Sequence, residues 1–285
     1  MKINRISPDK HDYLQITSVI ADCPEKLNYI GKLPETRLPT VAIVGTRRPT
    51  AYGRDVTYRM AYDLAQRGIV IVSGLALGVD AISHQAALDA SGTTIAVLAN
   101  GLSHVYPRTN QRLADQIIAS GGAIISEYDD EVEARGFQFL ERNRIVSGLA
   151  DAVVITEAAA RSGTLNTATH ALEQGKNIFV VPGNITSALS AGCNSLLKQG
   201  AYPCTSVDDI LAAIAPNDSE AQTTLPLGTT ALETAIIELL RQGIRDGDEM
   251  QRTTKANASD FSMSLTMLEL NGVIRALGAN QWTLR

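Results

Sequence analysis

The sequence contains little cysteine and no long apolar run. Its three cysteines (Cys23, Cys193 and Cys204) are far apart in 285 residues, which excludes a disulfide framework and favours a reducing compartment. No apolar stretch approaches the roughly 18 residues of a membrane span. The N-terminus lacks the continuous apolar core of a signal peptide. We therefore expect a cytoplasmic globular protein without membrane insertion.

The sequence also lacks an excess of basic residues. The 25 Lys and Arg against 30 Asp and Glu give a net charge of −5, which excludes a uniformly basic nucleic-acid coat or a polybasic membrane binder. The arginines are clustered, however. Residues 45–60 hold four arginines against one aspartate, and residues 135–144 hold three against one glutamate. We therefore expect any polyanion to bind at a few places only.

Six apolar runs alternate with helical patterns between residues 40 and 215. They cover residues 41–45, 69–74, 94–101, 123–127, 151–158 and 177–183. Most are continuous, which is typical of strands buried on both faces of a parallel sheet. Val56, Met60 and Leu64 form one helical stripe between the first two runs, and Gly68 would end that helix. The fold class is therefore α/β: an extended Rossmann-like, doubly wound, mostly parallel sheet.

The flanking segments differ from this domain, which we place at residues 40–215. Residues 1–39 include Pro24, Pro34 and Pro39 and have no sustained period, so we expect a lead-in with one short helix. Residues 216–229 are polar, with two prolines, and are typical of a linker.

Residues 230–285 predict a small winged-helix-like domain. Two helical stripes, formed by Leu232, Ile236, Leu239 and Leu240 and by Leu265, Met267 and Leu268, precede a predicted hairpin over 273–284. From residue 220 onward there are 6 basic and 8 acidic residues, or a charge of −2. We expect this tail to contact protein or to regulate, rather than to hold nucleic acid.

The loop after the first run predicts an anion site. Gly45, Thr46, Arg47 and Arg48 follow a strand whose carboxyl end faces the ligand crevice of a doubly wound sheet. Glycine lets backbone N–H groups approach an anion, and arginine adds bidentate phosphate donors. The alternative is a plain strand-to-helix connection with solvated arginines. The loop lacks G-x-G-x-x-G and G-K-[ST], so a nicotinamide or Walker-type site is a poor match.

Three further segments carry similar chemistry. The stretch from Arg161 through Ser162 and Gly163 to Thr164 begins a helix, where its hydroxyls either cap that helix or bind an anion. Arg108 follows a Tyr-Pro pair after the third run. Residues 136–144 interleave aromatic rings with arginines, a composition that single-stranded nucleic acid favours. The alternative for this last segment is a buried aromatic face and a solvated arginine face.

Catalytic patterns are scarce. The four histidines have no metal spacing, the cysteines form no C-x-x-C pair, and no G-x-S-x-G elbow is present. Glu127 and Glu157 end strands and could act as bases, although carboxylates are common there. Asp80 and His84, at i and i+4, indicate a structural pair. We therefore predict no catalytic residue, no metal and no cofactor.

Five motifs follow one another between residues 42 and 201. They are AIVGTRRPTAYG, IVSGLALGVDAISHQAAL, TIAVLANGLSHVYPRTN, FLERNRIVSGLADAVVITEAAARSGT and FVVPGN followed by GCNSLLKQGA. Together they resemble the DNA-processing protein A (DprA or Smf) family. The resemblance implies a non-enzymatic, homodimeric binder of single-stranded DNA. Such proteins protect incoming DNA and load the recombinase RecA onto it during natural transformation.

The resemblance also implies a set of DNA-binding residues. The G-T-R arginine matches Arg47, the basic residue after Tyr-Pro matches Arg108, and F-x-x-R-N-R begins at Phe139. With the loops above, the predicted set is Gly45, Thr46, Arg47, Arg48, Gly74, Arg108, Phe139, Arg142, Asn143, Arg144, Arg161, Ser162, Gly163 and Thr164. The chain departs from the family pattern at Leu77, where a basic residue is frequent, and at Leu140, where proline is usual.

A nucleotide-processing enzyme of the LOG phosphoribohydrolase type is the alternative. Those proteins bind a nucleotide phosphate at a Gly-Thr helix start, as Gly163 and Thr164 could do here. The P-G-G that should precede this pair is missing, and Thr167 stands where the glutamate should follow.

Overall fold

The computed structural model describes residues 2–214, 230–271, 273–278 and 280–284. Two compact units divide the chain, the first ending at Ser219 and the second beginning at Glu220. The linker predicted at 216–229 lies outside the described residues.

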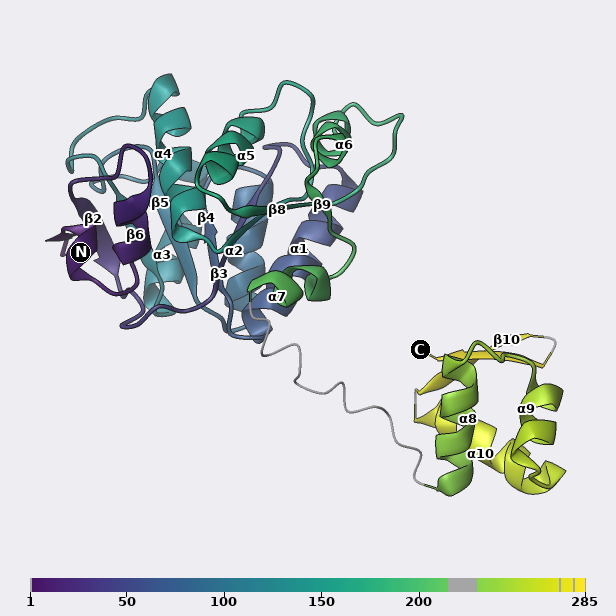
Figure 1. Ribbon diagram of the computed structural model, residues 1–285. Coiled ribbons are helices and arrows are strands. Elements are labelled where there is room, and N and C mark those ends of the chain that lie inside the picture. Colours follow the sequence, from purple (N-terminus) through teal and green to yellow (C-terminus); the bar gives the residue numbers. More distant parts are fainter. Residues whose placement is uncertain (1, 215–229, 272, 279, 285) are drawn as a thin grey trace. The chain divides into compact units, whose positions relative to one another are not determined.

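The larger unit is built on one nine-stranded sheet (Figure 1). Its strands are β1 (Asn4–Ile6), β2 (Leu27–Gly31), β3 (Thr40–Val44), β4 (Val70–Ser73), β5 (Thr94–Leu98), β6 (Ala123–Ser126), β7 (Ala152–Ile155), β8 (Asn177–Val180) and β9 (Tyr202–Pro203). Their order is β1-β2-β6-β5-β4-β3-β7-β8-β9, parallel from β6 to β9. This is a Rossmann-type order in which the winding reverses between β3 and β7.

Seven α-helices lie within the described residues of this unit and cover both faces of the sheet. They are α1 (Ala51–Gln66), α2 (Val79–Asp89), α3 (Gln111–Ala119), α4 (Gly136–Leu149), α5 (Thr164–Glu173), α6 (Ala191–Lys198) and α7 (Val207–Ile214). The cores put α4, α5 and α6 on one face and α1, α2, α3 and α7 on the other. The prediction of a doubly wound, mostly parallel α/β fold is confirmed.

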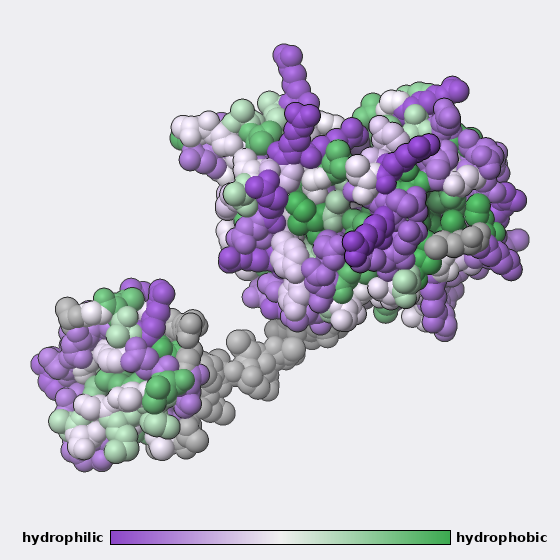
Figure 2. Space-filling model, turned by 180° about the vertical axis from the view of Figure 1, so that it is seen from behind, coloured by the Kyte–Doolittle hydropathy of each residue, from purple (hydrophilic) through white to green (hydrophobic). Residues whose placement is uncertain are grey.

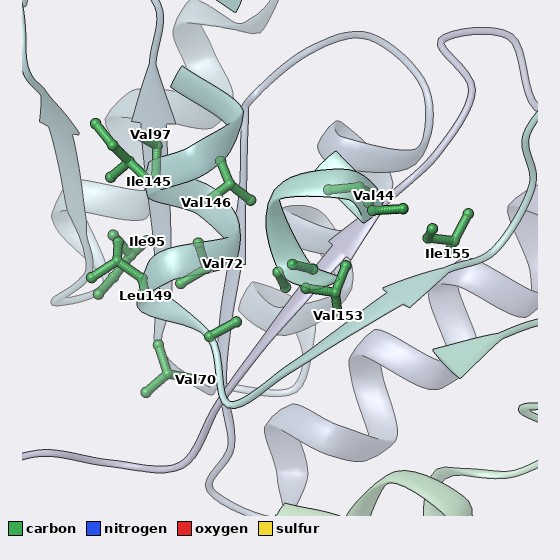
Figure 3. Close-up of a cluster of buried hydrophobic side chains, with 14 of the residues drawn as sticks. Val44, Val70, Val72, Ile95, Val97, Ile145, Val146, Leu149, Val153 and Ile155 are labelled. Atoms are coloured by element: carbon green, nitrogen blue, oxygen red, sulfur yellow. The ribbon is translucent and has the colours of Figure 1, made fainter. Parts of the chain in front are cut away.

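Alternation along each strand fills both layers. In β3, Val41 and Ile43 pack with α1, whereas Ala42 and Val44 pack on the α4 side. Figure 3 shows Ile145, Val146 and Leu149 of α4 against valine and isoleucine side chains of the central strands. Because both faces are buried, the inner positions of the parallel strands β3 to β8 are apolar, and Thr, Ser or Asn occurs only at their ends. Their sequences are therefore nearly continuous apolar runs.

The N-terminal segment differs from the predicted lead-in. Residues 4–6 and 27–31 form β1 and β2, and β2 pairs antiparallel with β6. Two short 3₁₀ helices, Pro8–Lys10 and Gln15–Val19, lie between them. Since β2 contains a buried asparagine and ends in glycine, it carries little strand signal of its own. Pairing with β6 stabilises it instead.

Asp80 and His84 are not paired with each other, so the predicted structural pair is wrong. The Asp80 carboxylate accepts the backbone N–H groups of Gly74 and Ala76 at 3.1 and 3.3 Å. His84 Nδ1 lies 2.6 Å from Thr94 Oγ1, whose own proton goes to a backbone carbonyl. His84 Nε2 is buried, and no described residue bonds to it. Each side chain therefore ties its helix to a different part of the sheet.

Protein stability is expected to fall in mild acid because of His84. Burial lowers the pKa of His84 to about 3, whereas an unfolded histidine titrates near 6.5. Below about pH 6.5 the unfolded state therefore binds a proton that the folded state refuses. The free energy of unfolding should drop by about 2 kcal/mol from pH 7 to pH 5. Urea unfolding at both pH values measures this change in the free energy of unfolding. His84→Gln keeps a donor without titrating and should show little of this drop; an equal drop in the variant would assign it to other groups.

The described residues of the smaller unit form three helices and a hairpin. They are α8 (Ala231–Arg241), α9 (Gly247–Thr254), α10 (Ala258–Leu270), β10 (Ile274–Gly278) and β11 (Gln281–Leu284). Thr230 and Glu233 form a capping box at the start of α8. The expected hairpin is present, and a bridge from Asp246 to Gln281 adds a third short extended segment. This is the winged-helix arrangement that the sequence predicted.

The second predicted stripe of this unit is wrong at one position. Phe261, Leu265 and Leu268 face the small core, whereas Met267 is 45% exposed. In a helix with 3.6 residues per turn, position 267 lies about 100° from position 268. Met267 instead shares a face with Met263 and Leu270.

Hydrophilic and apolar side chains are interspersed on the face of the larger unit that Figure 2 shows. Figure 2 shows a face of the larger unit that carries mainly hydrophilic side chains, with apolar ones in small groups between them. No helix within the described ranges is long and apolar enough to cross a membrane.

Candidate nucleic-acid interface

A cavity of the larger unit lies at the carboxyl ends of β3 and β7, where the winding of the sheet reverses. Its volume is about 480 Å³, within the range of about 300–1,000 Å³ usual for ligand sites. Four segments line it: the loop after β3, the loop after β4, the first turns of α4, and the loop leading into α5. Such crevices are where ligands bind in open α/β sheets.

The cavity brings most of the predicted residues together. Nine of them line it: Gly45, Thr46, Arg47, Phe139, Arg142, Asn143, Ser162, Gly163 and Thr164. The remaining five, Arg48, Gly74, Arg108, Arg144 and Arg161, do not. Segments far apart in sequence thus form one site, as the position of the loops at one sheet edge predicted.

Glu157 fixes the loop after β3. Its buried carboxylate accepts both the N–H and the hydroxyl of Thr50, each at 2.8 Å, and its carbonyl accepts the N–H of Thr46 at 2.7 Å. Thr50 in turn accepts the N–H of Gly53 and caps α1. Gly45 is needed because a Cβ there would collide with Val79 and the Glu157 backbone. Glu157 is therefore a structural carboxylate, not a free base.

Arg47 lies in the middle of this loop and over an aromatic ring. Its guanidinium carbon is 5.3 Å from the centroid of Phe139, and the Phe139 ring lies 5.5 Å from that of Tyr106. Arg47 is exposed, and Tyr106 is 46% exposed. Three segments thus present a cation and two rings together, a combination that suits a phosphate next to an unstacked base.

Arg142 lies in the floor of the cavity, not on its surface. It is only 5% exposed, and its guanidinium donates to the carbonyls of Gly74, at 2.6 Å, and of Val97. Burial lowers the pKa of Arg142, and the charge of Asp80 opposes that effect. Burial likewise raises the pKa of Asp80, opposed first by Arg142. The two charges compensate each other in the floor, so the geometry gives Arg142 a structural task.

Two other members of the arginine motif also have protein partners. Asn143 donates to Asn166 at 3.1 Å. Arg144 forms an ion pair with Glu127 at 2.6 Å and is 13% exposed. It lines a separate cavity of about 130 Å³ beside Gln174. Glu127 is therefore also committed to a structural contact.

Four arginines of the predicted set remain exposed: Arg47, Arg48, Arg108 and Arg161. No carboxylate of the described residues pairs with any of them. They are the groups best able to neutralise a polyanion at this edge.

The cavity also contains residues that sequence reasoning missed. Thr167 and Asp80, only 2% and 7% exposed, both line it. Thr167 could have been found from its position one helical turn after Thr164, which points both side chains along one face. Asp80 could not, since only the folded loop after β4 reveals its contacts. Leu77, which departs from the family pattern, is 46% exposed.

Catalytic and metal-binding arrangements do not emerge from the residues that the structure describes. No three His, Cys, Asp or Glu side chains come together there as metal ligands would. Asp80 is the carboxylate in the described lining of the cavity, and it accepts the backbone N–H groups of Gly74 and Ala76.

The outer face of α10 carries apolar side chains and no basic side chain. Met263, Met267 and Leu270 are 64%, 45% and 76% exposed and follow one another at i, i+4 and i+7. The helix contains Asp260 and Glu269 but no lysine or arginine. In helix-turn-helix proteins the corresponding face enters the DNA major groove and needs polar or basic side chains. This face lacks them.

The strand order and the cavity at its reversal point define a Rossmann-like α/β protein, here joined to a winged-helix unit. The family model described as DNA recombination-mediator protein A matches residues 4–215, and that of the DprA winged helix domain matches residues 218–280. The chain therefore belongs to the DNA recombination-mediator protein A family, as its motifs predicted.

Relatives with assigned names agree. DNA processing protein DprA of Bacillus subtilis is 44% identical over 170 residues, 60% of this chain and 57% of that protein. Protein Smf of Escherichia coli is 41% identical over 206 residues, 72% of this chain and 55% of that protein. The chain thus spans a little over half the length of these two relatives.

Two solved structures share the fold. DprA from Streptococcus pneumoniae superposes with a TM-score of 0.70 at 39% identity, covering 75% of each chain. DprA from Helicobacter pylori gives a TM-score of 0.65 at 34% identity, covering 74% of this chain and 94% of that one. The latter structure describes a single-stranded DNA binding mode of the Helicobacter protein.

Proposed function

We propose that this protein is a single-stranded DNA-binding recombination mediator. The observation that carries the proposal is the Arg47–Phe139–Tyr106 stack at the cavity. Rings of this kind accept bases that are free of a duplex, while the cation holds the neighbouring phosphate. Family membership and the DNA-bound mode described for the Helicobacter relative support it.

The strand is held by its backbone. The exposed arginines named above neutralise phosphates along the sheet edge, and the rings stack on bases without reading their identity. Binding is therefore tolerant of sequence and sensitive to salt. A duplex offers the same phosphates but no free base face, so it binds more weakly.

The bound strand is passed to a partner recombinase, RecA, and is protected meanwhile. The protein acts as a cytoplasmic homodimer, because two cavities on one strand raise the effective concentration of each. Sedimentation should give twice the 30.4 kDa mass of the chain; a monomer at all working concentrations would remove this part of the proposal.

No catalytic step is part of the proposal. The phosphoribohydrolase alternative needs a carboxylate free to act at the nucleotide. Glu127 and Glu157 are occupied by Arg144 and Thr50, and Asp80 accepts two backbone N–H groups. No observation favours this alternative. Release of free base from a nucleoside monophosphate would revive it.

The mediator role is tested by RecA assembly on coated DNA. RecA hydrolyses ATP slowly on an oligonucleotide that is already covered by single-strand-binding protein. Adding the protein should restore hydrolysis, and Arg47→Ala should restore much less. Failure of the wild type to restore hydrolysis at any ratio would leave a DNA binder that is no mediator.

Removal of the winged-helix unit is expected to change single-strand affinity little. A chain ending at Ala215 keeps the cavity. The face of α10 that would enter DNA carries Met263, Met267 and Leu270 instead of lysine or arginine side chains. Anisotropy of a labelled oligonucleotide compares the truncated and full chains. Loss of most of the affinity on truncation would show that the tail grips DNA.

A further inference from the structure

One wall of the cavity is formed by hydroxyl groups at the start of α5. We call it the hydroxyl wall and define it as Ser162, Gly163, Thr164 and Thr167, all of which line the cavity. Thr164 and Thr167 are only 8% and 2% exposed. The little surface that they keep lies in the cavity wall. Polar groups so deep in a protein ordinarily have hydrogen-bond partners.

The hydroxyl wall has donors left over. Ser162 Oγ donates to Thr164 Oγ1 at 3.0 Å and accepts the N–H of Thr164 at 3.2 Å. The proton of Thr164 Oγ1 goes to no described residue, and the hydroxyl of Thr167 has no hydrogen-bond partner among them. By contrast, Thr169 of the same helix bonds back to Leu165. Two recessed hydroxyls are therefore free to donate to a ligand.

The helix adds to these donors. α5 has ten residues and no acidic residue in its first turn, so no carboxylate offsets the positive end of its dipole. The N–H groups of Thr164, Leu165 and Asn166 already bond to Ser162 and Gly163. Nothing lies within 4 Å of the place where a Cβ on Gly163 would be. A ligand oxygen can therefore approach the backbone at this position.

We propose that the hydroxyl wall binds a terminal phosphate monoester, at the end of a DNA strand or on a free nucleotide. The inference rests on the proposed DNA-binding function and extends it to strand ends. A phosphate within a strand is a diester, so the DNA chain must pass out of the recess on both sides of it. A terminal phosphate is joined to the DNA on one side only and can enter the recess end first. It also presents three oxygens to the convergent hydroxyls and carries a larger charge.

The remaining charges in the cavity permit an anion. Asp80 is the one carboxylate in the described lining, and its charge is balanced by Arg142 beneath it. Arg47 lines the same cavity and is exposed to it. The neighbouring nucleotide can thus keep its contacts with Arg47 and Phe139 while the end group occupies the hydroxyl wall.

The test compares internally labelled oligonucleotides that differ only at one end. The full chain is titrated against the same sequence with a 5′-hydroxyl, a 5′-phosphate or a 3′-phosphate, and anisotropy is measured. One end phosphate should raise the affinity about tenfold, as charge-assisted hydrogen bonds usually do. In Thr167→Val the affinities for the end-phosphorylated and the 5′-hydroxyl oligonucleotides should become nearly equal. Thr167→Ser keeps the hydroxyl and should still prefer the oligonucleotide with the end phosphate.

Thr169→Val is the matched control, because it removes a hydroxyl from the exposed face of the same helix. It should leave the preference intact. Thymidine monophosphate and thymidine then separate the two sources. If thymidine monophosphate displaces the labelled oligonucleotide and thymidine does not, the site also binds free nucleotides. If the end-phosphorylated oligonucleotide is preferred but the monophosphate displaces nothing, the site binds strand ends only.

Equal affinity for all three oligonucleotides would overturn this inference and leave the proposed function standing. A preference that survives in Thr167→Val, with the variant folded by circular dichroism, would also overturn it. Absence of binding to any of the oligonucleotides would instead reject the proposed function.

Discussion

Arg47→Ala is expected to weaken single-stranded DNA binding by about 10- to 100-fold, the usual effect of losing a charged hydrogen-bond donor. Arg47 lines the cavity, and its loop is already held by Glu157, so no reordering of the loop is needed on binding. The substitution removes the phosphate contact and also the cation over Phe139. Anisotropy of a labelled oligonucleotide measures the loss.

Arg67→Ala is the matched control for this prediction. It removes the same charge from the far end of α1, where Arg67 pairs with Asp208, and should change affinity little. The salt dependence should also separate the two variants. Four exposed arginines predict a log–log slope near −3 for the wild type, and loss of one contact should reduce its magnitude by about 0.7. Equal losses in both variants would mean that net charge, not the cavity, determines binding.

Arg142→Met is expected to destabilise the protein by about 3–5 kcal/mol, the usual effect of removing one partner from a buried charged network. The substitution leaves the carbonyls of Gly74 and Val97 without their donor and Asp80 without its compensating charge. The loop after β4 and strand β5, which the guanidinium joins through Gly74 and Val97, lose their common partner. Urea unfolding gives the change in free energy.

Arg48→Met is the control for Arg142, because Arg48 is exposed and its guanidinium has no partner among the described residues. Its effect on stability should stay within about 0.5 kcal/mol. A folded Arg142→Met protein with unchanged stability and strongly reduced DNA affinity would contradict this account. Arg142 would then contact phosphate, as the motif by itself predicts.

The central sheet could be predicted because its strands are buried on both faces. Runs such as residues 41–45 and 152–155 are apolar at every position, and no other element of this length needs that pattern. β1, β2 and β9 were missed for the opposite reason. β1 and β9 are the edge strands and β2 is next to β1, and at these positions the neighbouring strands decide which residues pair. The tail fold followed from its two stripes and its hairpin, although Met267 faces the other way.

The site could be predicted as a place more easily than as a set of contacts. Loops at the carboxyl ends of parallel strands meet at one edge, so the glycines and arginines of four segments were expected to be neighbours. A motif gives residue types but not burial. Arg142 and Arg144 are therefore equivalent to Arg47 in the sequence, and only the fold shows that their guanidinium groups already have partners. The unpaired hydroxyl of Thr167 is invisible for the same reason.

The most direct test of the account is the affinity of the full chain for one labelled oligonucleotide, single-stranded and annealed to its complement, at two salt concentrations. The account predicts tighter binding of the single strand at both, because the rings of Phe139 and Tyr106 need free base faces, together with a loss of affinity as salt rises. Equal binding of both forms, or an affinity that salt does not change, would contradict a cavity that holds a single strand by its phosphates and bases.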